Sequence, residues 1–458
     1  MLFHTWTFAV FFAIVYPVYR LTKGTRLELP WLLAASYVFY GWWNPLYLIL
    51  IAYGTIVDYW IVVRMEKSRR KKRWIALSVV SNLGLLGFFK YAGFVATNLN
   101  WGLAHLGLRY AIPAPDILLP VGISFFTFQS MSYILDCYRG HVERERSFLR
   151  YAVYVSLFTQ LVAGPIERAS NLLRQLREEH RVTREDITDG LSLFAAGLFK
   201  KVALADYLAL YVDKVYGAPG TFQAPALALA TFAFAWQIYF DFSGYTDMAR
   251  GIARTMGLRL LLNFNHPYLA DSLGDFWQRW HISLSTWFRD YVYIPLGGNR
   301  GGALATYRNM VLTMVISGLW HGAAWTFLIW GVLHALGRVL TRELERSRFY
   351  RERVPRPLKQ LGVFAFVTFA WIFFRAPSLG DAWLIVSRIA TSGWADPAFP
   401  LLALGLALSV WVYQFLCESK ARAMLEWAPV RVSMAVVLIV YLATFPAGAA
   451  QKFIYFQF

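Results

Sequence analysis

Stretches of about 20 apolar residues recur along almost the whole chain, and this pattern constrains the fold more than any other feature. The hydrocarbon core of a bilayer is about 30 Å thick, so a helix needs roughly 20 apolar residues to cross it. Backbone amides find no water inside a bilayer, so each crossing segment must be helical. Of the 458 residues, 58% are hydrophobic and only 16% are charged, which leaves no stretch for a separate water-soluble domain. The sequence predicts an all-α, polytopic integral membrane protein with one transmembrane domain over residues 1–458.

We expect about ten to twelve transmembrane helices, together with re-entrant and interfacial helices. The interruption at Asn44 and Pro45 divides the apolar residues between 26 and 64, for which two short helices or a re-entrant hairpin are expected. Residues 148–164 are apolar but short, so they are expected to be re-entrant. A charged helix is expected over residues 168–185, on the cytoplasmic face. The other expected crossings lie within residues 3–19, 74–99, 118–138, 191–216, 226–242, 309–340, 362–374, 401–417 and 433–450.

Short basic loops separate the apolar stretches and predict the orientation of the chain. The strongest groups of Lys and Arg lie within residues 64–73 and 338–359. Short basic loops stay on the cytoplasmic side, so both are expected there and the N-terminus is expected outside. The formal net charge of +18 therefore reflects membrane topology and contact with membrane lipid. No nucleic acid is expected as a partner.

The two cysteines, Cys137 and Cys417, each end an apolar run beside a basic loop. The reducing cytosol keeps such thiols free, so no disulfide is expected. The Cys and His spacings do not match a structural metal site. Neither a metal nor a tightly bound cofactor is expected.

Residues 275–298 combine aromatic and polar side chains in a helical pattern. With 3.6 residues per turn, Trp277, Trp280, His281 and Leu284 lie on one side of the expected helix, and polar side chains lie on the other. Such a helix is expected to dip into the protein from the cytoplasmic interface and to bury His281. The alternative is an interfacial helix whose histidine is only packed.

Residues 317–330 hold one histidine, His321, among small residues and indoles. Gly318 and Gly322 lie one turn apart, which permits a helix or a substrate to approach the backbone closely. Basic loops flank the apolar run 309–340 on both sides, so this run is expected to turn near His321 and to leave it around mid-depth. The alternative is a packing histidine bonded to a carbonyl. His334 falls on another side of the helix and is expected to be structural.

Residues 239–248 place two carboxylates and two kinds of hydroxyl at the end of an apolar span. Asp241, Ser243 and Tyr245 are candidates for substrate contact. Helix capping by Asp241 and Ser243, with Asp247 paired to a nearby arginine, is an equal alternative.

Five blocks together resemble the membrane-bound O-acyltransferase family. In chain order they are VGISFFTFQSMSYILD, YFDFSGYTDMA, NFNHPY, FWQRWHISLSTWFRDYVYIPLGGNR and SGLWHGAAWTF. WHG in an apolar run is a weak signal alone, but five blocks in this order cover nearly the whole chain. The IPLGGNR ending is similar to the alginate O-acetyltransferase branch, whereas the branch that transfers D-alanine to teichoic acid usually lacks it.

This resemblance implies the family's fold and an O-acyltransferase activity, specifically of an acetyltransferase. His321 corresponds to the principal catalytic histidine of the family, and His281 to its second position. Trp280, Trp320 and Trp325 are expected to surround the two histidines and to contact substrate. The resemblance also implies a multi-pass protein of the bacterial cytoplasmic (inner) membrane.

Acyl transfer from a thioester to an alcohol requires a base for the hydroxyl proton and a donor to the oxyanion. Neutral His321 is expected to take the proton, while His281 orients the thioester carbonyl or stabilises the oxyanion. The expected donor is cytosolic acetyl-CoA or another acyl thioester, including one on an acyl carrier protein. The expected acceptor is an extracytoplasmic polysaccharide such as an alginate-like exopolysaccharide. The outer loops are short, so an extracytoplasmic acetyltransferase or another polysaccharide-modification partner is also expected.

Two other functions fit parts of the same pattern. A transporter or flippase also has many spans and a basic cytoplasmic face, but it has no need for both His281 and His321 within these blocks. Transfer of D-alanine or another acyl group to a different envelope polymer or protein is the alternative among enzymes.

Overall fold

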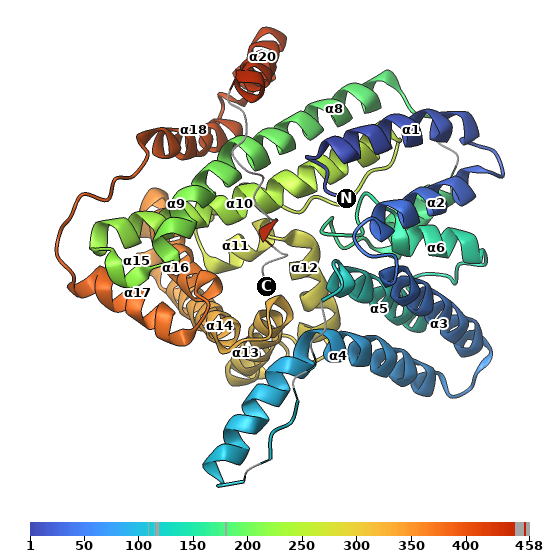
Figure 1. Cartoon of the computed structure of the whole chain (residues 1–458), viewed down its shortest axis with the longest axis horizontal. Helices are drawn as coiled ribbons and strands as arrows, with labels where there is room; N and C mark the ends of the chain where they lie inside the picture. Colours follow the sequence, from blue (N-terminus) through green and yellow to red (C-terminus); the bar gives the residue numbers. More distant parts are fainter. Residues whose placement is uncertain (109, 114, 116–118, 179–180, 445–452, 455–458) are drawn as a thin grey trace. The chain divides into compact units, whose positions relative to one another are not determined.

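The computed structural model describes residues 1–108, 110–113, 115, 119–178, 181–444 and 453–454. Every regular element within these ranges is helical (Figure 1), so the all-α prediction is confirmed. The chain divides into two compact units, Met1–Leu191 with Ala249–Leu261, and Ser192–Met248 with Leu262–Phe458. Helices α8 (Arg184–Phe199) and α10 (Ala224–Thr255) contribute residues to both units.

Five helices of the described chain are long and apolar enough to cross a membrane. They are α3 (Tyr47–Lys67), α4 (Lys71–His105), α10, α16 (Arg356–Arg375) and α18 (Leu401–Glu418). Helix α1 (Trp6–Thr22) is apolar but shorter. Other apolar stretches form helices too short to cross a hydrocarbon core of about 30 Å. Helix α2 (Glu28–Gly41) has 14 residues and α6 (Phe148–Ser156) has nine. The expected number of crossings counted such stretches as well.

The first unit contains the interruption and the short segment that the sequence predicts. Helices α2 and α3 are separate, with Asn44 and Pro45 between them. Helix α6 is followed by turns as far as Gly164, and this whole stretch is buried from Tyr151 onward. The expected helix over residues 168–185 is wrong in its length. Helix α7 (Ala169–Arg177) ends where Glu178 adopts an extended backbone with ψ of 134°.

A buried carboxylate links two membrane-spanning helices of this unit. Asp58 on α3 is fully buried and accepts hydrogen bonds from the Ser78 hydroxyl at 3.0 Å and the Asn82 amide at 2.9 Å, both on α4. Polar groups inside a bilayer protein are costly unless they are bonded to one another. These bonds therefore fix the pairing of α3 with α4. Helix α5 (Ile123–Arg139) packs against both.

The second unit has a core dominated by aromatic side chains. Trp236 on α10 and Trp371 on α16 are at most 1% exposed, and both belong to one continuous cluster. This unit also holds helices α9 (Asp206–Tyr216), α11 (Leu273–Arg279), α12 (Ile282–Phe288), α13 (Gly302–His321), α14 (Trp325–Arg346), α15 (Arg348–Arg353), α17 (Leu379–Thr391), α19 (Arg422–Glu426) and α20 (Ala428–Thr444). A rigid aromatic core is a suitable support for side chains that must keep a fixed geometry.

Candidate active site

Helices α13 and α14 form a tight hairpin that turns immediately after His321, and Figure 1 shows the two lying side by side. Two glycines permit this close packing. A Cβ atom on Gly318 would lie 2.3 Å from the Phe327 carbonyl oxygen, and one on Gly322 would lie 2.0 Å from the Phe327 ring. The predicted turn near His321 is confirmed. About 13 residues separate His321 from Arg308 on α13, so His321 lies about 20 Å of helical rise beyond that charge.

His281 lies between two short helices, so the single helix expected over residues 275–298 is wrong. Helix α11 ends before Trp280, and α12 begins at Ile282. His281 itself adopts the left-handed conformation, with φ of 42° and ψ of 55°. This conformation is uncommon for a residue with a side chain and tends to occur at functional sites. The break turns the imidazole into the protein, where it is fully buried.

Asn263 holds this break in place, and sequence reasoning gave it no role although it begins the NFNHPY block. Its carbonyl oxygen accepts from the Ile282 N–H at 2.9 Å, and its side-chain oxygen accepts from the Ser283 N–H at 3.2 Å and hydroxyl at 2.9 Å. These bonds satisfy N–H groups at the start of α12 that no residue of the helix can reach. Asn263 thereby performs the work of an N-cap from outside the helix.

The structure brings His281 and His321 together. Their ring centroids are 6.5 Å apart, and His321 is only 5% exposed. Trp320 contacts both rings, at 4.9 Å from His321 and 6.1 Å from His281. This spacing leaves a reacting carbonyl within reach of both imidazoles.

The other two predicted tryptophans lie elsewhere. Trp280 is buried in the aromatic core, where its ring packs 5.1 Å from Phe264 and from Trp371. Trp325 begins α14 and is 54% exposed. The second indole against His321 belongs instead to Trp330, at 5.1 Å. Trp330 lies at the end of the segment 317–330 that the sequence marks as a candidate site. His334 is fully buried, and its ring lies 4.7 Å from Trp330.

The three candidates on α10 face a polar cluster and the end of the chain. Asp241 pairs with the buried Lys201 amine at 2.9 Å and accepts from the Ile454 N–H at 2.7 Å. Ser243 is buried. The Tyr245 ring lies 4.8 Å from the Phe453 ring. Asp241 and Ser243 lie in the middle of α10, so the expected alternative that they cap a helix is wrong. Asp247 pairs with Lys200 at 2.7 Å.

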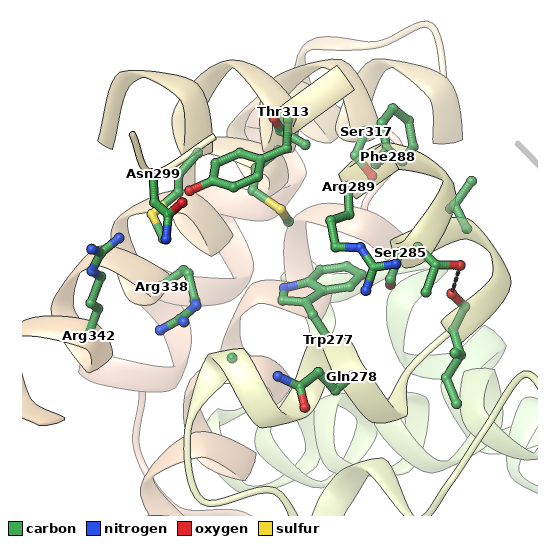
Figure 2. Close-up of a pocket in the computed structure, with 17 residues that line it drawn as sticks. Trp277, Gln278, Ser285, Phe288, Arg289, Asn299, Thr313, Ser317, Arg338 and Arg342 are labelled. Carbon is green, nitrogen blue, oxygen red and sulfur yellow. Dashed lines mark hydrogen bonds between the residues drawn. The ribbon is translucent and has the colours of Figure 1, made fainter. Parts of the chain in front are cut away.

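A cavity of about 670 Å³ lies beside the two histidines. Ile282, next to His281, and Ser317, one turn before His321, both line it. Figure 2 shows Arg338 and Arg342 of α14 on one side and Ser285 and Arg289 on the other. Sequence reasoning missed these arginines, although the spacing of Arg338 and Arg342 places both on one helix face. The cavity can therefore take a ligand with both apolar and anionic parts.

The GGNR turn forms one edge of this cavity. Gly297 and Gly298 have φ angles of 111° and 56°, which favour glycine. The Asn309 amide donates to the Gly298 carbonyl oxygen at 3.0 Å and fixes the turn against α13. The next residue, Asn299, lines the cavity.

The helical membrane fold agrees with the comparison to known proteins. The chain belongs to the membrane-bound O-acyltransferase family, whose model matches residues 123–380. It is a multi-pass membrane O-acyltransferase.

Several named proteins are similar over 60–86% of the chain. A probable alginate O-acetylase of Pseudomonas aeruginosa is 42% identical over 86% of this chain and 75% of its own length. The peptidoglycan O-acetyltransferase of Helicobacter pylori is 37% identical over 77% of this chain and 72% of its own length. The teichoic acid D-alanyltransferase of Streptococcus thermophilus is 25% identical over 60% of this chain and 69% of its own length.

Proposed function

We propose that this protein transfers an acetyl group from a cytosolic thioester toward a hydroxyl of an extracytoplasmic polysaccharide. The observation that carries this proposal is the pair of buried histidine rings 6.5 Å apart, next to a cavity lined by three arginines. A transporter has no use for this combination. The proposed location is the bacterial cytoplasmic (inner) membrane.

His321 acts as the general base and removes the proton of the attacking hydroxyl. His281 donates a hydrogen bond to the thioester carbonyl as negative charge develops on its oxygen. Both roles require neutral imidazoles, and the aromatic surroundings of each ring favour that form. The fixed backbone of His281 holds its ring in one orientation, which suits a group that must stabilise a short-lived oxyanion.

The donor enters the arginine-lined cavity from the cytoplasmic side. Coenzyme A and an acyl carrier protein both present a thioester at the end of a thin arm that carries phosphate. Arg289, Arg338 and Arg342 provide donors for phosphate oxygens. The arm then extends past Ser317 toward His321. Acetyl-CoA and an acyl carrier protein remain alternative donors for this geometry.

The acceptor polymer is proposed from the relatives. Proteins named as probable alginate O-acetylases are 37–42% identical to this chain, and the peptidoglycan O-acetyltransferase is 37% identical. These names refer to O-acetylation of alginate or of peptidoglycan, which supports an alginate-like exopolysaccharide as the acceptor here. Transfer of D-alanine has weaker support, since the relative of that name is 25% identical.

Delivery to the polymer involves an extracytoplasmic partner. The two histidines lie inside the protein, and a hydrated sugar chain cannot cheaply enter the hydrocarbon region. The immediate acceptor is therefore either the polymer or a hydroxyl of the partner that passes the acetyl group on.

The test uses membranes that contain the full chain, radiolabelled acetyl-CoA and the native polymer system. His321→Ala should lower acetyl transfer by about 10²–10⁴-fold, because the base is lost. His281→Ala should lower it by about 10²–10³-fold, because the oxyanion loses a donor. His105→Ala is the matched control, since this histidine is exposed at the end of α4, and it should retain full activity.

Membrane insertion and thermal unfolding of each variant are measured in parallel. If His321→Ala lost activity only together with the folded state, the packing role would replace the catalytic one. If His281→Ala retained normal turnover, His281 would have no part in the reaction.

A further inference from the structure

Aromatic side chains from three helices close around His321. The ring centroids of Trp320 on α13, Trp330 on α14 and Phe374 on α16 lie 4.9, 5.1 and 5.3 Å from the His321 ring. The four rings are all at most 5% exposed. Rings at such distances are in contact, so Phe374 leaves no room for a chain of methylenes on its side of His321.

Phe374 forms a rigid part of this enclosure. It is 1% exposed, and its ring packs 4.9 Å from Phe327 and 5.1 Å from Trp371. The next residue, Arg375, pairs with Asp213 of α9 at 2.7 Å and fixes the end of α16. Turning the Phe374 ring aside would therefore displace several packed aromatic rings, which a close-packed core resists.

We propose that Phe374, supported by Trp330, determines acyl-chain length by restricting the group transferred at His321 to two carbons. This inference rests on the proposed acyl transfer, and it adds the residue that selects the acyl group. In the reaction the hydroxyl oxygen forms a bond to the acyl carbon, the carbon–sulfur bond breaks, and the proton taken by His321 passes to the departing thiolate.

The steric argument follows from the position that reaction imposes on the acyl carbon. The attacked carbonyl carbon must lie about 3–3.5 Å from the nucleophile, so its substituent points into whatever space remains beside His321. A methyl group is the smallest alkyl substituent. Each added methylene would have to overlap the Phe374 ring or push the carbonyl out of line, and one methylene in a tight pocket changes selection by about 10–200-fold.

Phe374 is the best ring of the three to alter. Trp330 also supports His334 and packs on Trp371 at 5.8 Å, so its removal would open the core. Trp320 contacts both histidines. Phe374 contacts His321, and its truncation keeps Trp320, which contacts both histidines, so the histidine pair should stay in place.

The experiment is a competition assay in membranes that hold the full chain and its polymer system. Equal amounts of acetyl-CoA, propionyl-CoA and butyryl-CoA are supplied together, and the esters released from the polymer are quantified. The ratio of products in one mixture gives the ratio of kcat/KM values and does not depend on the amount of folded protein. The wild type should favour acetyl over butyryl by at least about 100-fold.

Phe374→Ala and the milder Phe374→Leu should raise the butyryl-to-acetyl ratio by at least about tenfold, with the larger effect for alanine. Phe373→Ala is the matched control, because this neighbour is only partly buried and packs on Phe369 at 5.9 Å, and its ratio should equal that of the wild type. Unchanged ratios in active Phe374 variants would overturn the proposal. If Phe374→Ala does not fold, Phe374→Leu alone decides in the same way.

The outcome also separates this inference from the proposed function. A wild type that transfers acetyl while its Phe374 variants keep its selectivity contradicts only the role of Phe374. A wild type that transfers none of the three acyl groups contradicts the proposed donor, and the inference fails with it.

Discussion

The left-handed backbone of His281 costs a residue with a side chain about 1–3 kcal/mol, so the surrounding contacts must hold it there. Asn263 fixes the start of α12 through three hydrogen bonds. On the other side, the Phe242 ring meets the imidazole edge to face at 4.7 Å. The backbone held by Asn263 and the ring packed against Phe242 limit the freedom that His281 can lose when a substrate binds, which favours a role in transition-state stabilisation.

The backbone conformation of His281 and the contacts that hold it could not be predicted from sequence patterns. The aromatic spacing of Trp277, Trp280 and His281 does predict a helix, and helix α11 exists. The break at His281 depends on Asn263, which meets it only through the tertiary fold. The family blocks singled out His281 and His321. The number of residues between them in the sequence did not indicate how close the two rings lie in the fold. Phe374 lies outside those blocks, so no local signal marked it.

Glu167 is a buried carboxylate in the first unit, outside the candidate membrane spans. It accepts hydrogen bonds from the Leu261 N–H at 2.6 Å and from the Asn171 amide at 2.7 Å. Burial raises the pKa of Glu167 from 4.5 to about 7, against the opposing effect of these hydrogen bonds and of nearby arginines. The native state therefore keeps a proton between about pH 4.5 and 7 that the unfolded chain has released.

The predicted consequence is that the free energy of unfolding falls as pH rises through this window. Glu167→Gln cannot ionise, so the same part of the pH dependence should disappear. Thermal unfolding in detergent at a series of pH values from 4.5 to 8 measures this difference between the two proteins. Parallel pH profiles for wild type and Glu167→Gln would show that Glu167 does not titrate in this range.

At the scale of elements, the helices follow from local apolar runs, while their lengths and turns follow from packing. The interruption at Asn44 and Pro45 was predictable because proline and its neighbours disfavour helix locally. The short lengths of α2 and α6 were not predictable, because an apolar run packs equally well against protein and against lipid. The turn between α13 and α14 was predictable in outline, from the basic residues on both sides of the run.

The α13–α14 hairpin depends on its glycines, and Gly318→Ala tests this. A Cβ at this position would lie 2.3 Å from the Phe327 carbonyl oxygen, so the two helices must separate. We expect a loss of about 1–3 kcal/mol in the free energy of unfolding, together with lower turnover because His321 shifts. Gly362→Ala on α16 is the control. It has open space around its Cβ position and should be neutral or stabilise by about 0.5–1 kcal/mol. Equal thermal stability of both variants would contradict tight hairpin packing.

The polar cluster around Lys201 joins the π-helical segment Lys200–Ala205, which leads into α9, to α10 and to Ile454. The Lys201 amine lies 2.7 Å from Asp206 and 2.9 Å from Asp241, and Asp241 also accepts the Ile454 N–H. Asp241→Ala should cost about 1–3 kcal/mol more than Asp241→Asn, because Lys201 keeps Asp206 in both variants but the buried Ile454 N–H loses its acceptor only in the alanine variant. Asp241→Asn keeps an oxygen for that N–H and leaves the Lys201–Asp206 pair neutral. It should cost no more than about 1.5 kcal/mol. Denaturant or thermal unfolding would refute this account if both variants lost the same stability.

For the whole molecule, the position of the site within the membrane decides how the reaction can be organised. The histidine pair and the arginine-lined cavity belong to one compact unit. Along α13, helical rise places His321 about 20 Å beyond Arg308. If Arg308 lies at the cytoplasmic edge, about 10 Å of a 30 Å hydrocarbon core remains between His321 and the outer edge. In the proposed reaction, a thin thioester arm enters from the basic side and the polymer is reached from the other.

This geometry predicts that polymer O-acetylation requires an extracytoplasmic partner in addition to this chain. A sugar chain that entered the remaining hydrocarbon depth would lose hydrogen bonds from many hydroxyls to water, and each unreplaced bond costs about 1–3 kcal/mol. A partner that carries the acetyl group over this last distance avoids that cost. Cells that lack the partner should therefore lose polymer esters while this protein stays inserted at its normal level. The measurements are ester release from the purified polymer and immunoblotting of the membranes, with re-expression of the partner as the control. Purified protein that acetylates the polymer alone, at the rate of the complete system, would show that the sugar itself reaches His321.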